Sequence, residues 1–384
     1  MTVALIVGTR PEAIKLAPLA SLLGPEALVV HTGQHHTAGM TGHLTPDIEL
    51  HTAHDTTRGA QLGAMTSALD QLFRKNRPDV VVVQGDTTSA LAGALAANAT
   101  DMPLVHVEAG LRSFDRAMPE EHHRVLIDHL ADLCCAPTPV ARDNLLAERI
   151  PPSRIAVTGN PIVEAVGHNL PQPEHQLQLL NQLGLTTSAF ILATLHRPEN
   201  TDNPDALETI LRELTALREP VVLALHPRTQ RQITKFSLTT LTREIRCSGP
   251  LDYPMLLTLI RHAAVVISDS GGVQEETTVL KRPILVIRRS NERPEVEATF
   301  GARLRPGQDI AGTVNQWLSD IAATHTRLAD QRCPYGDGTA TRRIADAMQT
   351  VRRSARTLCP VPKTSHHRPM SLRALSVQPS SSRM

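Results

Sequence analysis

Short apolar runs alternate with amphipathic stretches along the first half of the chain. The runs occupy residues 3–7, 28–31, 80–83, 104–107, 133–136 and 155–158. Each is continuous rather than alternating, which is typical of parallel strands that are buried on both faces. Between two of them, Leu62, Met65, Leu69 and Phe73 recur at helical spacing. Strands that alternate with helices predict a parallel, doubly wound sheet with right-handed crossovers.

The same alternation resumes after residues 169–188, a segment rich in Pro, Gln and Leu that we expect to connect two domains. It predicts strands at 190–195, 221–225, 245–247, 263–267 and 284–287, helices at 205–217 and 253–262, and a polar loop at 196–204. The fold class is therefore α/β, with two doubly wound Rossmann-like domains whose parallel sheets face each other across a cleft. We expect the N-terminal domain to span residues 1–168 and the C-terminal domain to span residues 169–338.

Three further segments lack strand character. Residues 32–57 predict a long surface loop near the strand ends, and such loops tend to be functional. Apolar residues at Ile344, Met348 and Val351 predict an amphipathic helix over 339–355. Residues 356–384 contain no acidic residue and few groups that could form a core, so we expect a disordered tail.

The composition excludes several classes of partner. The net charge is +1, from 39 basic and 38 acidic residues, and aromatic residues make up 2% of the chain, so neither a nucleic acid nor a membrane surface is an expected partner. The five cysteines are odd in number and none has CxxC spacing, which argues against a disulfide framework and a zinc site. The first residues lack the basic start of a signal peptide, and no apolar stretch approaches about 18 residues, so we expect a cytoplasmic protein.

One polar stretch has the form of an anion site. Residues 268–276 (SDSGGVQEE) follow an apolar run and precede a segment of helical character. Ser270 would cap the helix, and Gly271 and Gly272 would let a phosphate approach unpaired N–H groups at its start. Glu276 would lie one turn further, within reach of a ribose diol. For this stretch taken alone, a capped strand-to-helix turn without a ligand is the more common explanation, because Gly-Gly turns are frequent.

Other polar residues gather where strands end, which is where ligands bind in open α/β sheets. A cleft lined by these cations and carboxylates suits a nucleotide-sugar diphosphate, because cations stabilise the anionic leaving group and carboxylates move protons on the sugar side. Each residue alone also has a structural explanation: Asp86 could cap a helix, and Glu108 could pair with Arg112. The residues concerned are Arg10, Asp86, Glu108, Arg112, Glu120, Glu121, Arg124, His196, Arg197 and His226.

Two common cofactor signals are missing from the sequence. The first strand is not followed by GxGxxG, so binding of NAD is unsupported. The histidine pairs at 35/36, 122/123 and 366/367 are adjacent rather than four residues apart, so a helical metal pair is not expected. We therefore expect neither a cofactor nor a metal ion.

Eight sequence blocks, in order, carry a family resemblance. They are GTRPEAIK (8–15), QGDTT (84–88), HVEAGLR (106–112), PEE with Arg124 (119–121), GNP (159–161), HRPEN (196–200), DSGGVQEE (269–276) and ERPE (292–295). Over residues 2–352 the chain resembles the non-hydrolysing UDP-N-acetylglucosamine 2-epimerases. The resemblance implies a GT-B-like fold, UDP held mainly by the C-terminal domain, and a C-terminal helix that returns to the first domain.

The resemblance also implies a reaction and its residues. The family interconverts UDP-GlcNAc and UDP-ManNAc by eliminating and re-adding UDP through a 2-acetamidoglucal intermediate, without a redox cofactor, and homodimers are expected. Asp86, Glu108, Glu120 and His196 match its catalytic positions. Arg10, Lys15, Ser270, Gly271, Gly272, Glu276 and Arg293 match its substrate-binding positions, to which the strand-end analysis adds Arg124, Arg197 and His226.

Two departures from the family pattern affect specificity and regulation. Leu251 and Leu256 stand where relatives often have a glutamine and an aromatic residue near the uracil, so the resemblance is weaker for base recognition than for the diphosphate site. Residues 66–68 lack the arginine that helps hold a second, activating substrate molecule, so we expect substrate activation to be weak or absent. A hydrolysing 2-epimerase, a GT-B glycosyltransferase and a catalytically inactive nucleotide-sugar sensor are the alternatives.

Overall fold

The computed structural model describes residues 1–34, 44–51, 57–249 and 251–353. Two parallel sheets organise them, and residues 1–353 pack as one compact unit. The first sheet has the strand order β3 (Ile48–Glu49), β2 (Ala27–His31), β1 (Val3–Val7), β4 (Val80–Gln84), β5 (Leu104–Val107), β6 (Leu133–Ala136) and β7 (Ile155–Val157). The second has the order β10 (Arg246–Ser248), β9 (Val221–Leu225), β8 (Ile191–Leu195), β11 (Val265–Ser268), β12 (Ile284–Ile287) and β13 (Gly301–Leu304).

Both sheets are doubly wound. In each sheet the first strand of the chain lies in the interior, and later strands are added on both sides of it. Strand β1 lies between β2 and β4, and β8 lies between β9 and β11. The order of winding therefore reverses between β1 and β4 and again between β8 and β11. Loops that leave the carboxyl ends of such neighbouring strands diverge and form a natural ligand site. The predicted fold class is confirmed.

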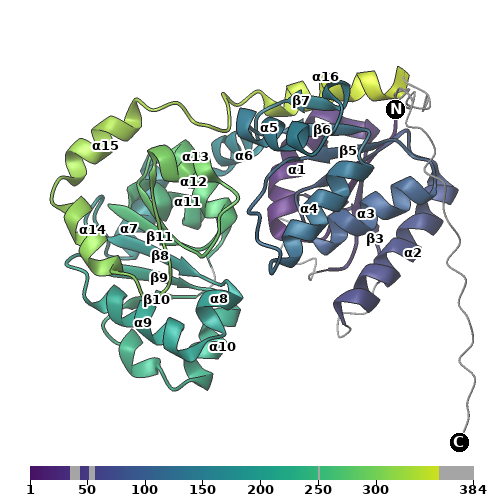
Figure 1. The fold of residues 1–384 in the computed structure, drawn as a ribbon. Coiled ribbons are helices and arrows are strands. Elements are labelled where there is room, and N and C mark those ends of the chain that lie inside the picture. Colours follow the sequence, from purple (N-terminus) through teal and green to yellow (C-terminus); the bar gives the residue numbers. More distant parts are fainter. Residues whose placement is uncertain (35–43, 52–56, 250, 354–384) are drawn as a thin grey trace, which may run out of the picture. The chain divides into compact units, whose positions relative to one another are not determined.

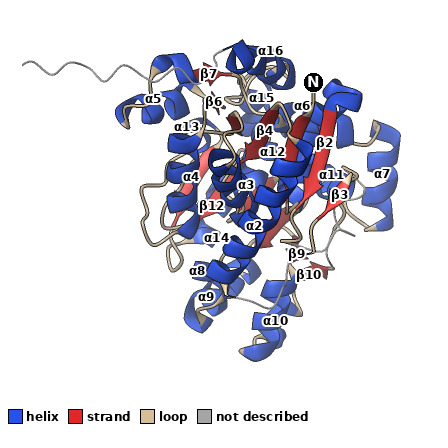
Figure 2. Ribbon diagram, turned by 90° about the vertical axis from the view of Figure 1, so that its right-hand side faces the viewer, coloured by secondary structure: helices blue, strands red, loops and turns tan. Residues whose placement is uncertain are grey.

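Helices cover both sheets (Figures 1 and 2). Many begin at a proline, whose fixed φ and missing N–H suit the first helical position. In the first half they are α1 (Arg10–Leu23), α2 (Arg58–Asn76), α3 (Thr88–Ala99), α4 (Pro119–Leu130), α5 (Pro139–Ala147) and α6 (Ile162–Asn169). In the second half they are α7 (Pro173–Gln182), α8 (Pro198–Thr201), α9 (Pro204–Thr215), α10 (Pro227–Lys235), α11 (Tyr253–His262), α12 (Gly271–Leu280), α13 (Pro294–Thr299), α14 (Ile310–Leu318), α15 (Ile321–Ala329) and α16 (Ala340–Arg353).

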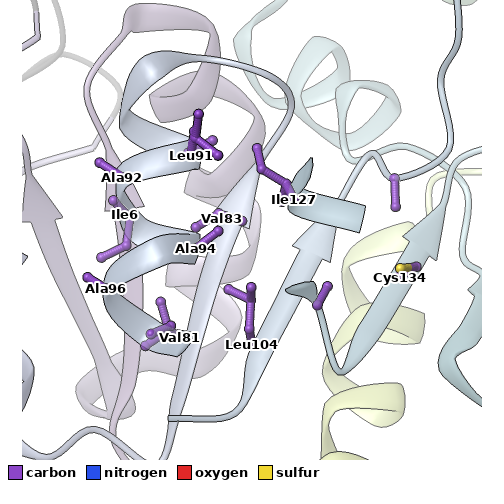
Figure 3. Close-up of a cluster of buried hydrophobic side chains, with 14 of the residues drawn as sticks. Ile6, Val81, Val83, Leu91, Ala92, Ala94, Ala96, Leu104, Ile127 and Cys134 are labelled. Carbon is purple, nitrogen blue, oxygen red and sulfur yellow. The ribbon is translucent and has the colours of Figure 1, made fainter. Parts of the chain in front are cut away.

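Alternate residues of the central strands serve two separate cores. On β1, Ala4 and Ile6 join a cluster with α3, while Val3, Leu5 and Val7 join a cluster on the opposite face. Small alanines let α3 lie close to the strands (Figure 3). Because both faces of β1 are buried, its sequence has to be a continuous apolar run rather than an alternating one.

Helix α16 packs against the first sheet. Ile344 and Met348 are fully buried in the same cluster as Val3, Leu5 and Val7, and α16 also contacts α1 and α6. The division into domains at residues 168 and 338 stays a prediction. The expected tail at 356–384 lies outside the described residues. Within the described residues, no helix is both long and apolar enough to cross a membrane.

Some elements differ from the sequence expectations. The expected polar loop at 196–204 contains the short helix α8, and the connection at 169–188 contains α7. Strand β3 falls within the expected loop at 32–57, of which residues 35–43 and 52–56 lie outside the described part. Strands β3 and β13 escaped prediction because each lies at a sheet edge, where pairing on one side does not require a continuous apolar run.

The packing of α16 generates a stability prediction. Ile344→Ala should lower the free energy of unfolding by about 2–5 kcal/mol, because the fully buried isoleucine side chain would be replaced by a cavity. The exposed Gln349→Ala on the same helix should change it by less than about 0.5 kcal/mol. Urea unfolding monitored by circular dichroism measures both, and equal effects would contradict the packing.

Candidate active site

Strand β11 leads into helix α12 through a short polar turn. Ser270 caps the helix, and its side chain accepts a hydrogen bond from the Val273 N–H at 3.5 Å. The Ser268 hydroxyl in turn accepts one from the Ser270 N–H at 3.0 Å. The unpaired N–H groups of the first helical turn are therefore presented at the carboxyl end of a central strand.

The two glycines of this turn have different surroundings. A Cβ at Gly272 would have no neighbour closer than the Glu276 carboxylate, at 3.9 Å, so this position faces open space. A Cβ at Gly271 would lie 2.5 Å from Nη1 of Arg293. Gly272 therefore leaves room for a ligand, whereas Gly271 leaves room for an arginine side chain.

Four buried charged side chains, which we call the ion quartet, join the carboxyl ends of the two sheets. They are Lys15 on α1, Glu108 after β5, Glu275 on α12 and Arg293 before α13. The Lys15 ammonium contacts the Glu108 carboxylate and lies 2.7 Å from that of Glu275. Arg293 lies 2.8 Å from Glu275 and 3.3 Å from Glu108. Two cations and two carboxylates balance each other, and each side chain is at most 7% exposed.

Burial acts on the charged groups of the quartet in opposite ways. Burial disfavours the Lys15 ammonium, but Glu108 and Glu275 outweigh it and raise the pKa of Lys15. Burial raises the pKa of Glu275, and Arg293 opposes that change. Lys15 therefore stays charged only because its partners are present.

The backbone of Glu108 is strained. Its φ of 71° lies in the left-handed region, which residues other than glycine seldom adopt. The carboxylate accepts further hydrogen bonds from Gln84, at 2.9 Å, and Asn160, at 3.1 Å. Such strain persists only where surrounding contacts hold it, and it is common at functional sites.

Asp86 forms a separate ion pair at the next strand end. Its carboxylate contacts Arg124, which also lies 2.6 Å from Glu121. Burial would raise the pKa of Asp86, but the Arg124 guanidinium outweighs it and holds that pKa below its usual range. Glu121 also accepts hydrogen bonds from the N–H groups of Ser113 and Phe114 and therefore holds the loop after β5.

Glu292 collects several arginine side chains. It contacts Arg293, lies 2.8 Å from Arg288 and lies 3.9 Å from Arg197. Burial opposes its ionisation, but Arg293 and Arg288 hold the pKa of Glu292 well below its usual range. Glu292 is therefore favoured in its ionised form, and it extends the quartet towards Arg197.

His196 is held by a carboxylate where the order of winding in the second sheet reverses, between β8 and β11. Asp269 lies 3.1 Å from Nδ1 of His196 and accepts the backbone N–H groups of His196 and Arg197. Burial opposes ionisation of Asp269, but His196 outweighs it, so the pKa of Asp269 is lowered. The rings of His196 and His226 are 5.5 Å apart, and burial and His196 lower the pKa of His226.

Glu276 directly follows Glu275 of the quartet on α12. Burial raises the pKa of its carboxyl group to about 7, against a hydrogen bond from Tyr253. Arg10 reaches the same region and donates to the Leu251 carbonyl at 3.2 Å. Leu251 and Leu256 both pack against the core of the second half.

The predicted site residues thus fall into connected groups. Lys15, Glu108 and Arg293 meet directly, Asp86 meets Arg124, and His196 meets His226. Glu120 is half-buried and has no hydrogen-bond or ion-pair partner within the described part of the chain.

Sequence reasoning missed three carboxylates, at Asp269, Glu275 and Glu292. Glu275 gave the clearest missed signal. Helix α12 is buried almost throughout, so a glutamate within it needs cationic partners from another element. No group of three side chains suited to a metal ion occurs among the described residues.

Two doubly wound sheets, with their polar groups gathered at the carboxyl ends, define a GT-B-like α/β enzyme. The chain belongs to a family described as UDP-N-acetylglucosamine 2-epimerase, whose family model matches residues 24–349.

Individual relatives match nearly the whole chain. The UDP-N-acetylglucosamine 2-epimerase of Methanocaldococcus jannaschii is 36% identical over 363 residues, which cover 90% of this chain and 98% of the relative. The crystal structure of the enzyme from that organism in complex with UDP-GlcNAc and UDP has a TM-score of 0.79 at 34% identity, covering 91% of this chain and 100% of that chain. The UDP-2,3-diacetamido-2,3-dideoxy-D-glucuronate 2-epimerase of Pseudomonas aeruginosa is 35% identical and covers 90% of this chain and 99% of its own.

The two glycines of the α12 turn generate a matched prediction. Gly271→Ala should lower the free energy of unfolding by about 1–3 kcal/mol, because its methyl group would displace Arg293 from three carboxylates. Gly272→Ala should stay within about 0.5 kcal/mol of the wild type, since nothing fills that space. Chemical denaturation without ligand measures the difference, and a loss at position 272 as large as at 271 would contradict it.

Proposed function

We propose that this protein reversibly epimerises UDP-N-acetylglucosamine at C2 to UDP-N-acetylmannosamine. In the forward direction a base removes the C2 proton while the C1–O bond breaks, which releases UDP and leaves 2-acetamidoglucal. UDP then adds back to C1 while C2 receives a proton on the opposite face. The sugar is neither oxidised nor reduced overall, so the reaction has no need of a redox cofactor.

One observation supports this proposal most strongly. Arg293 lies against Gly271 at the start of α12 and also reaches Glu108 at the end of β5. Arg293 therefore connects two parts of the proposed site. One is the helix start, which is suited to a phosphate, and the other is a carboxylate that could act on the sugar. In our proposal the diphosphate takes the helix start at Ser270 and Gly272, with Lys15 and Arg293 stabilising the charge that develops on the leaving UDP.

The remaining cations surround this position in the proposal. Arg10, Arg124, Arg197 and His226 supply positive charge or hydrogen-bond donors around the diphosphate and the sugar. Glu276 accepts from the ribose hydroxyls, and Leu251 and Leu256 offer an apolar surface to the base, consistent with their packing at the core of the second half. Because burial raises the pKa of Glu276 to about 7, its ability to accept both hydroxyls weakens as the pH falls below that value.

Proton transfer falls to Asp86, Glu108, Glu120 and His196. The lowered pKa of Asp86 keeps it ionised, which is the form that a base requires. Glu120 has no partner among the described residues, so its carboxyl group is available to exchange a proton. His196, held by Asp269, can take or return a proton near the leaving group.

The proposal extends to organisation. Residues 1–168, with the helix at 339–355, would carry the carboxylates, and residues 169–338 would bind UDP. We further propose a cytoplasmic homodimer that supplies ManNAc-type sugars for cell-surface polysaccharide or glycoconjugate synthesis.

A second sugar substrate has support from one relative. The Pseudomonas aeruginosa relative is named for UDP-2,3-diacetamido-2,3-dideoxy-D-glucuronate, and it is 35% identical to this chain against 36% for the Methanocaldococcus jannaschii relative. Inversion at C2 is common to both names. The test below therefore offers both sugars.

Deuterium exchange tests the proposed reaction. Incubation with UDP-GlcNAc in D2O, followed by NMR, should yield UDP-ManNAc and deuterium at C2 of both sugars. Release of free ManNAc would instead indicate the hydrolysing reaction, and exchange only with the diacetamido glucuronate would move the assignment to that sugar. No exchange with either substrate would contradict an epimerase.

A matched pair of variants tests the proton-transfer residues. Glu120→Gln should slow C2 exchange by about 10²-fold or more, because an amide cannot exchange a proton in this role. The control Glu208→Gln removes the charge of a glutamate whose side chain is 40% exposed and pairs with Arg212, and it should leave the rate unchanged.

A further inference from the structure

Glu12, in the first turn of α1, has a carboxylate surrounded by hydrogen-bond donors. One oxygen accepts from the N–H groups of Gly8, at 2.9 Å, and Thr9, at 2.8 Å, and from the Thr9 hydroxyl at 2.8 Å. The other oxygen accepts from the Thr87 hydroxyl at 2.5 Å. The residue is 1% exposed, so these protein groups replace water around it.

These contacts join the two loops that diverge from β1 and β4. Gly8 and Thr9 lead from β1 to Arg10, the first residue of α1, and Asp86 and Thr87 lead from β4 to α3. The Thr87 hydroxyl also accepts from the Ala90 N–H at 3.0 Å and so caps α3. One carboxylate therefore ties the start of α1 to the start of α3.

Residues of the proposed site lie on both sides of this link. Arg10 directly precedes Pro11 on α1 and reaches the Leu251 carbonyl, and Asp86 directly precedes Thr87 and contacts Arg124. A change in the separation of the loops would move a cation and a catalytic carboxylate relative to each other. Catalysis is sensitive to such displacements even when they are about 1 Å.

We propose that Glu12 is a positioning residue whose ionised carboxylate holds the start of α1, with Arg10, against the loop that carries Asp86, and whose protonation loosens that link and slows the reaction. This inference rests on the epimerase function proposed above. Glu12 itself contacts protein groups, and its effect on the sugar passes through Asp86 and Arg10.

The hydrogen-bond pattern explains why protonation matters. All four groups donate to the carboxylate, and only two of them, the Thr9 and Thr87 hydroxyls, have an oxygen that could accept an added proton. Protonation must therefore reverse one of these two hydroxyl hydrogen bonds and make the remaining bonds neutral. Hydrogen bonds to a charged acceptor are roughly twice as strong as neutral ones.

The ionisation of Glu12 falls in a measurable pH range. Burial raises its pKa to about 7, against the hydrogen bonds from Thr87, Gly8 and Thr9. The carboxylate is therefore mainly ionised at pH 8 and mainly protonated at pH 6. The rate should fall as the pH falls through about 7.

The same raised pKa has the opposite consequence for stability. A carboxyl group whose pKa is higher in the folded protein stabilises the fold at low pH, and that contribution is lost as the pH rises through about 7. Glu12→Gln should therefore be at least as stable as the wild type at pH 8, although it turns over more slowly. A purely structural residue would not separate the two properties in this way.

Charged groups near Glu12 are engaged elsewhere. Lys15 belongs to the ion quartet, Arg10 donates to Leu251, and Asp86 pairs with Arg124. No titratable side chain occurs on α3, β1 or β4. The groups that act most on the pKa of Glu12 do not include the titratable side chains of the other elements packed against α1. Those side chains are Glu26, His31 on β2, Glu164 and His168 on α6, and Arg342, Arg343 and Asp346 on the described part of α16.

Kinetics of four variants test the inference. Glu12→Gln and Thr87→Val should each lower kcat about tenfold at pH 8, with KM and the calorimetric Kd for UDP changed less than about threefold. Thr87→Ser should restore kcat, since it keeps the hydroxyl. The control Thr100→Val removes a similar side-chain hydrogen bond at the other end of α3 and should leave kcat unchanged.

The pH dependence provides the second arm. The wild type should lose kcat between pH 8 and pH 6, and Glu12→Gln should lose clearly less over the same range. Burial also raises the pKa of Glu276 to about 7, but Glu276 acts on the ribose, so its titration should change KM, and should do so in both proteins. A Glu12→Gln protein that keeps its kcat within about twofold, or that loses stability at pH 8 in proportion to its rate, would overturn the inference.

Hydrogen exchange separates this inference from the proposed function. Corrected for intrinsic rates, protection of the amides at 8–9 and 90 should fall when the wild type moves from pH 8 to pH 6 and should not change in Glu12→Gln. This readout needs no turnover, so a wild type without C2 exchange contradicts the epimerase alone. Protection that is equal at both pH values in the wild type contradicts the role of Glu12.

Discussion

The balance of charge in the ion quartet is the constraint on which the rest of the site depends. Lys15 and Glu108 come from the first half of the chain, and Glu275 and Arg293 from the second. Buried ions are costly unless each has a partner, so the four must be present together. The quartet therefore fixes the start of α1, the end of β5 and the start of α12 in one arrangement.

This arrangement accounts for other features of the site. The left-handed backbone of Glu108 is sustained by hydrogen bonds from Gln84 and Asn160 in addition to the two cations. Arg293 lies where a side chain at position 271 would otherwise be, which explains the first glycine of the turn. The second glycine, which has open space beside it, is the one suited to a ligand.

Two buried carboxylates have parallel roles in the two sheets. Glu12 links the loops after β1 and β4, and Asp269 links the loop after β8 to that after β11. Both sit where the order of strand winding reverses, which leaves a gap between diverging loops that hydrogen bonds must span. Burial dominates for Glu12 and raises its pKa, whereas His196 lowers that of Asp269, so of these two carboxylates Glu12 is the one expected to titrate near neutral pH.

The sequence predicted most of the central strands because residues buried on both faces must be apolar, as in β1 and β4. It also predicted that polar residues would collect at strand ends. It did not reveal Glu275 as the partner of Lys15, because that contact joins residues 260 positions apart and depends on how the two sheets pack. Roles within the site, such as that of Gly271 beside Arg293, depend in the same way on three-dimensional proximity.

A double-mutant cycle on Lys15 and Glu275 tests the charge balance most directly. Lys15→Met and Glu275→Gln should each lower the free energy of unfolding by about 3–5 kcal/mol, because each leaves an unpaired buried charge. The double variant keeps Glu108 paired with Arg293 and should therefore lose at least about 1 kcal/mol less than the sum of the single losses. Losses that add within about 0.5 kcal/mol would contradict the account.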